Sequence, residues 1–463
     1  MPDNLTDVLA EHLAGATFGA LPSVAVSRAR TRLLDALGLI AAGRRAAGST
    51  EVVDLVAGWG GRPDAHALTT RSKVPAMHAA MSNAVLMRSY DFEPVGADRA
   101  DGTQIPSHIT GTTVSVALAV AETVGASGRE LLTALVHGDD LAARLGHATG
   151  FDVYGGGDNT GTINVLGGAA TAGILLGLDA DGLRRALGVA VNQLGGTIDN
   201  INDKTLAFKL PIALSARNAV FSAELARAGF GGPEDPVGGR FGFLTQWTRD
   251  PARGPDRAVL LDGLGEQFFA DAVVKPWPTC RASQASLDAT VRLVETHGVT
   301  PDDVVRCTVH VTPQTKAGFV GQPFTVGRSP EVSGAFSIQF AVATALLDGT
   351  VTLAHLTPRH MASPRLRAML ERVELVPSLP PTEVRTAEVE VELCSGLRRR
   401  VRVEQVLGDV RLAPLSDERI ERKFRDNLAW GGLPEDAGDR LREIALGIED
   451  VDDVGEIAAL LAR

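Results

Sequence analysis

The sequence predicts a mainly α fold, in which a large helical domain formed by both ends of the chain is joined to a smaller α+β domain. Its 463 residues exceed what one hydrophobic core usually supports, so two domains are expected. Helical periodicity dominates the first part of the chain and the last 60 or so residues, whereas strand periodicity is confined to the region between. We therefore expect a helical domain over 1–267, an α+β domain over 268–404 and returning helices over 405–463.

The first part of the chain has helix signals of several kinds. Ser127 followed by Glu130 predicts a capping box at a helix start. Asp179 then marks the start of a second helix, whose apolar stripe has spacings of four and three residues and consists of Leu183, Leu187, Val191 and Leu194. The chain has 50 glycines and only 5% aromatic residues. This composition is typical of helices that pack closely through small residues.

The middle region alternates with the period of a β-strand. Apolar and polar residues alternate over 305–311, and again over 388–393 and 398–403. A three-residue turn at 395–397 would pair the last two segments and place Glu392 opposite Arg400 and Glu390 opposite Arg402. The basic run at 398–400 is then one face of a hairpin rather than a phosphate site. Helices are expected from about 285, over 334–347, and at 417–427 and 437–448.

Charge and cysteine usage restrict the partners. A formal net charge of −11 argues against nucleic acid, which needs a basic surface. The three cysteines form no CxxC pair, and the first residues lack a signal-peptide pattern, so a cytoplasmic location is expected. The longest apolar stretch, about 114–124, contains Glu122 and is too short to span a membrane. A small anionic substrate held by a few converging Lys and Arg residues fits this composition.

Several common reaction motifs are missing from the sequence. It contains no Walker loop, no HExxH and no GxSxG, and the glycines at 155–157 lack the preceding strand that a dinucleotide site needs. No local cluster has metal-ligand spacing, which leaves open only ligands contributed by distant segments. The sequence therefore favours reactions that need only proton transfer and charge stabilisation.

The first candidate pair for that chemistry is Asp91 and His108. Both residues are predicted in loops between helices, and His108 leads into an apolar helix over 112–124. A histidine near a helix N-terminus is disfavoured as an imidazolium, so His108 can serve as a neutral base. In the alternative interpretation, Asp91 caps a helix and His108 fills a polar corner.

Two further segments carry basic or nucleophilic groups. Lys209 stands between apolar residues and has Lys204 nearby, a setting in which an ammonium meets an anion. The alternative is a lysine whose head reaches solvent. Lys275, Cys280 and Arg281 follow one another in a proline-stiffened segment at the proposed domain boundary, where ligand sites are common. The alternative there is a rigid linker with a buried cysteine.

Taken in order, these segments resemble the MmgE/PrpD family over nearly the whole chain. No single motif is specific, but their shared order is. The matching segments are Asp91-Phe92 with His108, Thr160-Gly161-Thr162, Leu166-Gly167-Gly168, Ala216-Arg217-Asn218, Gly231-Gly232-Pro233, 275–280, Phe336-Ser337-Ile338, Pro414-Leu415-Ser416 and Lys423-Phe424-Arg425.

The resemblance implies an architecture and a set of active-site residues. It implies a homodimer, an active site between the helical domain and an α+β lid, and neither metal nor organic cofactor. Asp91 and His108 match the family's active-site Asp and His, and Lys275 matches a substrate-facing Lys. Cys280 stands where members have His or Cys, and Lys209 lies one residue from a further active-site Lys.

The chain also departs from the family pattern. Asp158 stands where many members have His, Gln284 where several have His, and Phe319 where decarboxylases have Tyr. The loop over 95–105 is longer than usual, and we expect its charged residues Asp98, Arg99 and Asp101 to cover the cleft. The residues expected to bind substrate are Lys204, Arg281, Asp158, Thr160 and Phe319.

These features predict an acid–base lyase, either a dehydratase or a decarboxylase, acting on a small di- or tricarboxylate. His108 would move the proton, and Asp91 would orient it or act as its partner. One alternative is an isomerase or epimerase with two bases on opposite faces of one carbon. Another is a non-catalytic binding protein on the same fold, because fold alone does not settle function.

Overall fold

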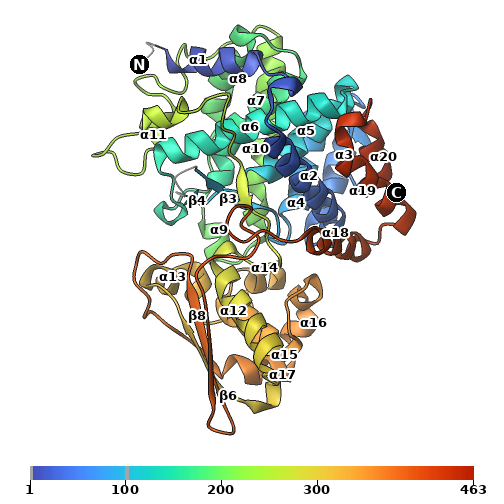
Figure 1. The fold of residues 1–463 in the computed structure, drawn as a ribbon. Coiled ribbons are helices and arrows are strands. Elements are labelled where there is room, and N and C mark those ends of the chain that lie inside the picture. Colours follow the sequence, from blue (N-terminus) through green and yellow to red (C-terminus); the bar gives the residue numbers. More distant parts are fainter. Residues whose placement is uncertain (1–3, 100–103, 463) are drawn as a thin grey trace.

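The computed structural model describes residues 4–99 and 104–462, and in it two lobes lie one above the other (Figure 1). The larger lobe is helical and contains both ends of the chain. Its helices before the smaller lobe are α1 (Leu5–Ala14), α2 (Ser23–Gly43), α3 (Ser49–Trp59), α4 (Ala76–Arg88), α5 (Thr110–Val124), α6 (Gly128–Thr149), α7 (Ile163–Leu175), α8 (Ala180–Ala190), α9 (Asp199–Asn202), α10 (Leu210–Arg227) and α11 (Phe243–Trp247).

The smaller lobe combines helices with a four-stranded sheet. The sheet order is β7 (Val373–Val376), β6 (Val304–His310), β8 (Ala387–Leu393) and β9 (Arg398–Val403), and β6–β7 is the parallel pair. Its helices are α12 (Arg281–His297), α13 (Pro313–Ala317), α14 (Pro330–Ala335), α15 (Ile338–Asp348), α16 (Pro358–Met361) and α17 (Pro364–Leu370). The predicted fold class, mainly α with a smaller α+β region, is confirmed.

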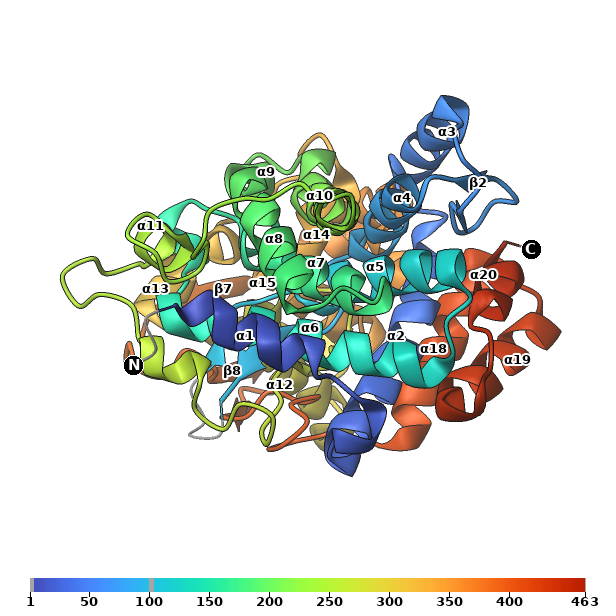
Figure 2. The same ribbon diagram turned by 90° about the horizontal axis from the view of Figure 1, so that it is seen from above.

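The chain then returns to the larger lobe as α18 (Asp417–Gly431), α19 (Glu435–Leu446) and α20 (Gly455–Leu461). Helices α18 and α19 pack against α2, and α20 packs against α5 (Figures 1 and 2). Phe424 of α18 packs over Gly38 of α2, and Lys423 Nζ lies 2.7 Å from buried Asp35 Oδ1. Helix α18 therefore supplies both an apolar and an ionic cover for α2.

Local sequence signals account for the helix ends and for their close packing. The Ser127–Glu130 capping box is present at the start of α6, and Asp179 caps α8. Helices α6 and α7 meet at glycines: a Cβ on Gly138 would lie 2.7 Å from the Gly167 backbone oxygen. Small contact residues thus permit the close approach that the composition predicts. No helix within the described ranges has the length and apolar character needed to cross a bilayer.

The predicted hairpin forms, but its register is wrong by two residues. Glu392 pairs with Arg398 and Glu390 with Arg400, because the turn contains residues 394–396 rather than 395–397. Gly396 has φ +80° and adopts the left-handed conformation that such a three-residue loop requires at its last position. The shift by two keeps every side chain on its predicted face, so the arginines still pair with glutamates.

The two segments that cross between the lobes are hydrogen-bonded to each other. Strand β5 (Asp271–Val273) pairs with β3 (Val95–Asp98), which also pairs with β4 (Gln104–Ile105). The Val274 backbone nitrogen donates to the Gly408 oxygen at 3.0 Å, and the Val410 nitrogen donates to the Ala272 oxygen at 2.8 Å. Gly408, at φ +97°, leaves no room for a Cβ beside Val274. The domain boundaries at 268 and 405 stay a prediction, and this junction lies next to both of them.

The remaining strands, β1 (Ala65–His66) and β2 (Lys73–Val74), form a small separate pair.

Candidate active site

A cavity of about 350 Å³ lies between the lobes. Arg88, His108, Asp158 and Asn159 line it from the helical lobe, and Cys280, Arg281, Phe319 and Arg385 from the α+β lobe. Several residues predicted from separate parts of the sequence therefore meet at one cavity. They are His108, Asp158, Cys280, Arg281 and Phe319.

Behind His108 is a buried ionic group that we call the His108 cluster, formed by Arg88, Asp91, Glu93, His108 and Lys275. Arg88 Nη1 lies 2.6 Å from Glu93 Oε1 and also contacts Asp91 Oδ1. Lys275 Nζ is 3.0 Å from Asp91 Oδ2 and donates to the Asp91 backbone oxygen as well. Two cations thus face two carboxylates in a nearly solvent-free site, as buried charges require.

Local structure positions both ends of this cluster. The chain leaves α4 through Asp91, whose φ of +51° is left-handed, a conformation that Asp tolerates better than most residues. His108 precedes α5, and the Asp271 carboxylate fixes that turn by accepting from Ser107 Oγ at 2.7 Å and the Thr110 nitrogen at 2.8 Å. Asp91 therefore caps no helix, and its backbone strain coincides with the candidate site.

Glu93, rather than Asp91, is the closest carboxylate to His108. His108 Nδ1 lies 2.9 Å from Glu93 Oε1, whereas Nε2 lies 3.9 Å from Asp91 Oδ1. Arg88 Nη1 is also 3.3 Å from Nδ1, but its two hydrogens are directed to the carboxylates of Asp91 and Glu93. We therefore assign the proton to Nδ1, which donates to Glu93 and leaves Nε2 with a lone pair.

The electrostatics keep Glu93 ionised. Burial alone raises the pKa of the Glu93 carboxyl, but the charges of Arg88 and His108 outweigh burial and hold that pKa below its ordinary value. Burial likewise disfavours the Arg88 guanidinium, yet Glu93 and Asp91 raise the pKa of Arg88 above its usual value. A carboxylate that stays ionised orients the imidazole and stabilises its protonated form.

Cys280 is a neutral thiol in this setting. It is the residue before α12, where a helix N-terminus would normally favour a thiolate. Burial, followed by the charge of Asp91, instead raises the pKa of Cys280 to about 11. Near neutral pH, Cys280 can therefore donate a hydrogen bond or a proton, but it is a poor base.

Two arginines of the α+β lobe give the cavity its positive side. Burial, followed by the charge of Arg385, lowers the pKa of Arg281 to about 10, so Arg281 is still charged at neutral pH. Two neighbouring guanidinium groups repel each other, and a bound carboxylate between them would relieve that repulsion.

Other predicted site residues lie outside the cavity lining. Lys209 Nζ is 2.9 Å from Glu331 Oε1, and burial lowers the pKa of this lysine. Lys204 donates to the Thr325 backbone oxygen at 2.8 Å and so bridges the lobes. Thr160 is buried behind the cavity and donates to Asp158 Oδ1 at 2.7 Å. Asp91 and Lys275 lie behind His108 rather than in the lining.

Two further sequence expectations concern Gln284 and the 95–105 loop. Gln284 Nε2 donates to Thr279 Oγ1 at 2.7 Å and so supports the turn before Cys280. Val95 and Ile105 at the loop ends line the cavity, but Asp98 pairs with Arg411 at 2.6 Å. Asp101 lies outside the described residues.

Sequence reasoning missed Glu93, Arg88 and Arg385. Glu93 could have been found from its place two residues after Asp91. Its contact with His108 could not, because the left-handed turn at Asp91 places the Glu93 carboxylate beside the imidazole. Arg88 belongs to an otherwise ordinary helix, and Arg385 comes from a loop 277 residues after His108 in the sequence. No local pattern signals either arginine.

Metal ligation is poorly matched to the His108 cluster. Ligand atoms of Asp91, Glu93 and His108 lie within 4.8 Å of one another. However, Arg88 and Lys275 already pair with both carboxylates, and their positive charges would repel a cation. The arrangement fits proton transfer better than metal binding.

Two family models and several known proteins match this chain in sequence. The MmgE/PrpD N-terminal domain model matches residues 7–254, and the C-terminal domain model matches residues 277–450. Cis-aconitate decarboxylase of Mus musculus is 26% identical over 491 residues, covering 100% of this chain and 94% of that protein. Cis-aconitate decarboxylase of Aspergillus terreus is 21% identical over 468 residues, covering 95% and 92%. A cis-aconitate decarboxylase-like protein of Aspergillus oryzae is 26% identical over 354 residues, covering 73% and 72%.

Proposed function

Because the chain belongs to the MmgE/PrpD family, we propose that it is a lyase that acts on a small di- or tricarboxylate by acid–base chemistry. The observation that carries the proposal is the His108–Glu93 pair: Glu93 is buried behind His108, and His108 lines a cavity whose other wall contains Arg281 and Arg385. A base and a carboxylate-binding wall are the two parts such a reaction needs. The decarboxylase relatives are consistent with a lyase on a carboxylate substrate.

In this proposal, the arginines hold the substrate carboxylates and His108 handles the proton. For a dehydration, His108 Nε2 removes a proton from the carbon beside a carboxylate, and the hydroxyl group on the adjacent carbon leaves as water after it takes a proton from protonated His108 or the Cys280 thiol. For a decarboxylation, the C–CO₂ bond breaks first, and protonated His108 or the Cys280 thiol protonates the carbanion. Arg281 and Arg385 stabilise the negative charge in either case.

The test is an NMR screen of the purified protein in deuterated water, with cis-aconitate and other small di- and tricarboxylates. We expect turnover of at least one compound and its loss in His108→Gln. A decarboxylation in deuterated water places deuterium at the product carbon, whereas a dehydration gives an unlabelled alkene and water. A substrate turned over equally well by that variant would contradict the role of His108. Ligand binding without turnover across the panel would favour a non-catalytic binding protein.

An epimerase is the second candidate, favoured by one feature. His108 and Cys280 approach the same cavity from different lobes, as two groups acting on opposite faces of a carbon would. Solvent exchange of the substrate's own hydrogen, with stereochemical inversion and no loss of water or CO₂, would identify this reaction. The raised pKa of Cys280 favours the lyase, because a neutral thiol is a poor second base.

We also propose that the protein acts as a homodimer. Leu210, Leu214 and Phe221 leave 44%, 38% and 39% of their surface exposed along α10. Trp59 of α3 is 51% exposed, and both helices pack against α4 at one edge of the molecule (Figure 2). Light scattering should give twice the chain mass, and Phe221→Glu with Leu214→Glu should give the monomer.

A further inference from the structure

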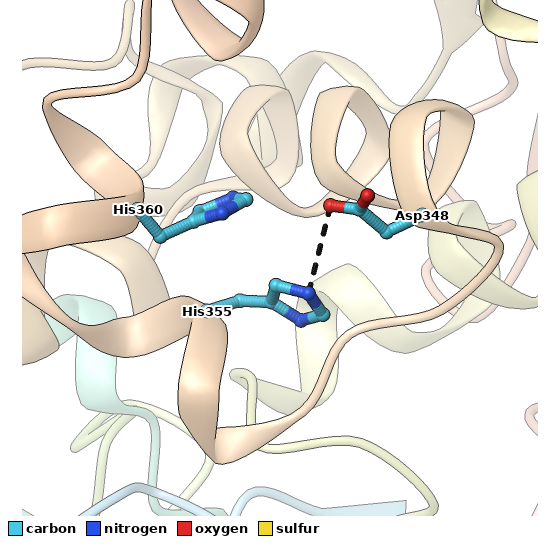
Figure 3. Close-up of side chains that lie close together, drawn as sticks. All are labelled: Asp348, His355 and His360. Carbon is cyan, nitrogen blue, oxygen red and sulfur yellow. Dashed lines mark ion pairs between the residues drawn. The ribbon is translucent and has the colours of Figure 1, made fainter.

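A second group of candidate ligands lies in the α+β lobe, away from the proposed active site. It consists of Asp348, His355 and His360, which we call the Asp348 cluster (Figure 3). Asp348 ends α15, His355 belongs to the short helix Leu353–Leu356, and His360 belongs to α16. One ligand atom from each residue lies within 4.8 Å of the other two.

We propose that the Asp348 cluster binds a divalent transition-metal ion, with Zn²⁺ as the natural probe. Two imidazoles and one carboxylate form a common set of protein ligands for such ions. His355 Nε2 lies 3.6 Å from Asp348 Oδ2, close to the roughly 3.4 Å that separates ligands around a tetrahedral zinc. The half-exposed carboxylate can rotate to close the remaining distance.

The surroundings of the cluster favour metal binding. Burial lowers the pKa of both histidines, so the imidazoles are neutral and able to coordinate near neutral pH. The two rings lie 4.7 Å apart between centroids. In the described part of the chain, no Lys or Arg forms an ion pair with Asp348. The carboxylate therefore keeps its charge available for a cation.

Metal binding requires a defined proton shift on His355. Its Nδ1 accepts from the Thr352 backbone nitrogen at 2.9 Å, which places the proton of neutral His355 on Nε2. When a metal takes the Nε2 lone pair, neutral His355 carries its proton on Nδ1 instead, and the hydrogen bond from the Thr352 backbone nitrogen is lost. Thr352 Oγ1, 3.2 Å from Nδ1, then accepts the Nδ1 proton. Thr352 is thus the residue that orients the ligand.

The bound metal would close a loop that forms one wall of a second cavity. Residues 349–354, between Asp348 and His355, line a cavity of about 540 Å³ together with Trp277 and α18 residues such as Arg419. A metal that ties residue 348 to residue 355 fixes this wall at both ends. The proposed metal therefore has a structural role: it stabilises the 349–354 loop and, through that loop, the contact between the lobes.

The test is calorimetric titration of the tag-free, chelator-stripped full chain with Zn²⁺. We expect one tight Zn²⁺ per chain and a rise in melting temperature, with affinity at least tenfold weaker in Asp348→Asn and His360→Gln. Thr352→Val should weaken binding roughly 10- to 100-fold, whereas Thr352→Ser should retain it. Co²⁺ in place of Zn²⁺ should give a tetrahedral absorption spectrum in the wild-type protein.

Two matched controls separate this site from other histidines. His310→Gln changes a histidine on β6 that bonds Ser378, and His108→Gln changes the other candidate cluster. Both variants should bind Zn²⁺ like the wild type. Absence of Zn²⁺ binding, or equal affinity in folded Asp348→Asn and His360→Gln variants, would overturn the proposal. Circular dichroism establishes that each variant is folded.

Discussion

The His108 cluster and the Asp348 cluster each bring histidine and carboxylate atoms within 4.8 Å, yet they differ in the charges around them. At the His108 cluster, Arg88 and Lys275 neutralise both carboxylates in a buried site. At the Asp348 cluster, two neutral imidazoles meet one exposed carboxylate. Proximity of ligand atoms is therefore an incomplete guide to chemistry. The neighbouring cations decide whether such a cluster favours proton transfer or metal binding.

The largest expected effect is on kcat, which should fall when the His108 cluster is changed but not when the Asp348 cluster is changed. His108→Gln removes the proposed base and should lower kcat by about 10²- to 10⁴-fold. The double variant His355→Gln/His360→Gln should leave kcat within about twofold, because the Asp348 cluster lies outside the cavity between the lobes. Steady-state kinetics on the substrate found by NMR measure both.

A matched control for that comparison is His66→Gln. His66 Nδ1 lies 2.6 Å from Glu122 Oε1, so it resembles His108 in having a carboxylate partner. It lies outside the cavity lining and its loss should leave kcat unchanged. A large loss of kcat in His66→Gln would show that removing a His–Glu pair can lower activity through the structure alone.

The next effect concerns stability. Lys275→Met leaves Asp91 buried with one cation fewer, which should lower the free energy of unfolding by about 3–5 kcal/mol. Asp348→Asn changes an exposed group and should cost less than about 1 kcal/mol in the absence of metal. Urea unfolding measures the free energy of unfolding of both variants. Equal losses in the two variants would contradict the distinction between a buried and an exposed cluster.

A smaller effect tests the assignment of Glu93. Glu93→Gln keeps the size of the side chain but removes the negative charge beside His108, and should lower kcat by less than His108→Gln does. The loss is smaller because the imidazole itself is kept. An acid limb of the kcat–pH profile that moves to lower pH in the variant would support an electrostatic role. An unchanged kcat and profile would mean that Glu93 is structural only.

The smallest effect follows from Cys280. Its folded-state pKa of about 11 lies above that of an ordinary thiol, so the unfolded chain ionises first as pH rises. This contribution to stability is complete below the ordinary thiol pKa and is lost as pH rises toward 11. The Cys280→Ser variant should therefore show a weaker fall in melting temperature between pH 9 and about 11.

Sequence reasoning recovered the elements whose signals are local. The capping box at Ser127 and the alternation over β8 and β9 depend only on neighbouring residues, and both are present. The expected helix over 334–347 is instead two helices, because the chain breaks at Phe336 before Ser337 caps α15. The hairpin register failed for a related reason, since alternation fixes the face of a strand but not the length of its turn.

Sequence reasoning predicted the residues of the candidate site that belong to recognisable motifs and missed the others. His108 and Cys280 were found through segments that resemble a family, and both line the cavity. Arg385 and the Glu93–His108 bond were missed because the packing of distant segments creates them. Lys209 looked like an anion-binding residue from its apolar neighbours, but the neighbour that it meets in space is Glu331.

The return of α18 to α2 has a consequence for how the chain folds. Their contact joins residues such as Gly38 and Phe424, separated by almost the whole chain, so its loop-closure entropy is among the largest in the protein. During synthesis, α2 is made early, but the side that faces α18 remains uncovered until residues 417–431 have left the ribosome. Chains that end before residue 417 should therefore expose the apolar face of α2 and aggregate or remain bound to chaperones.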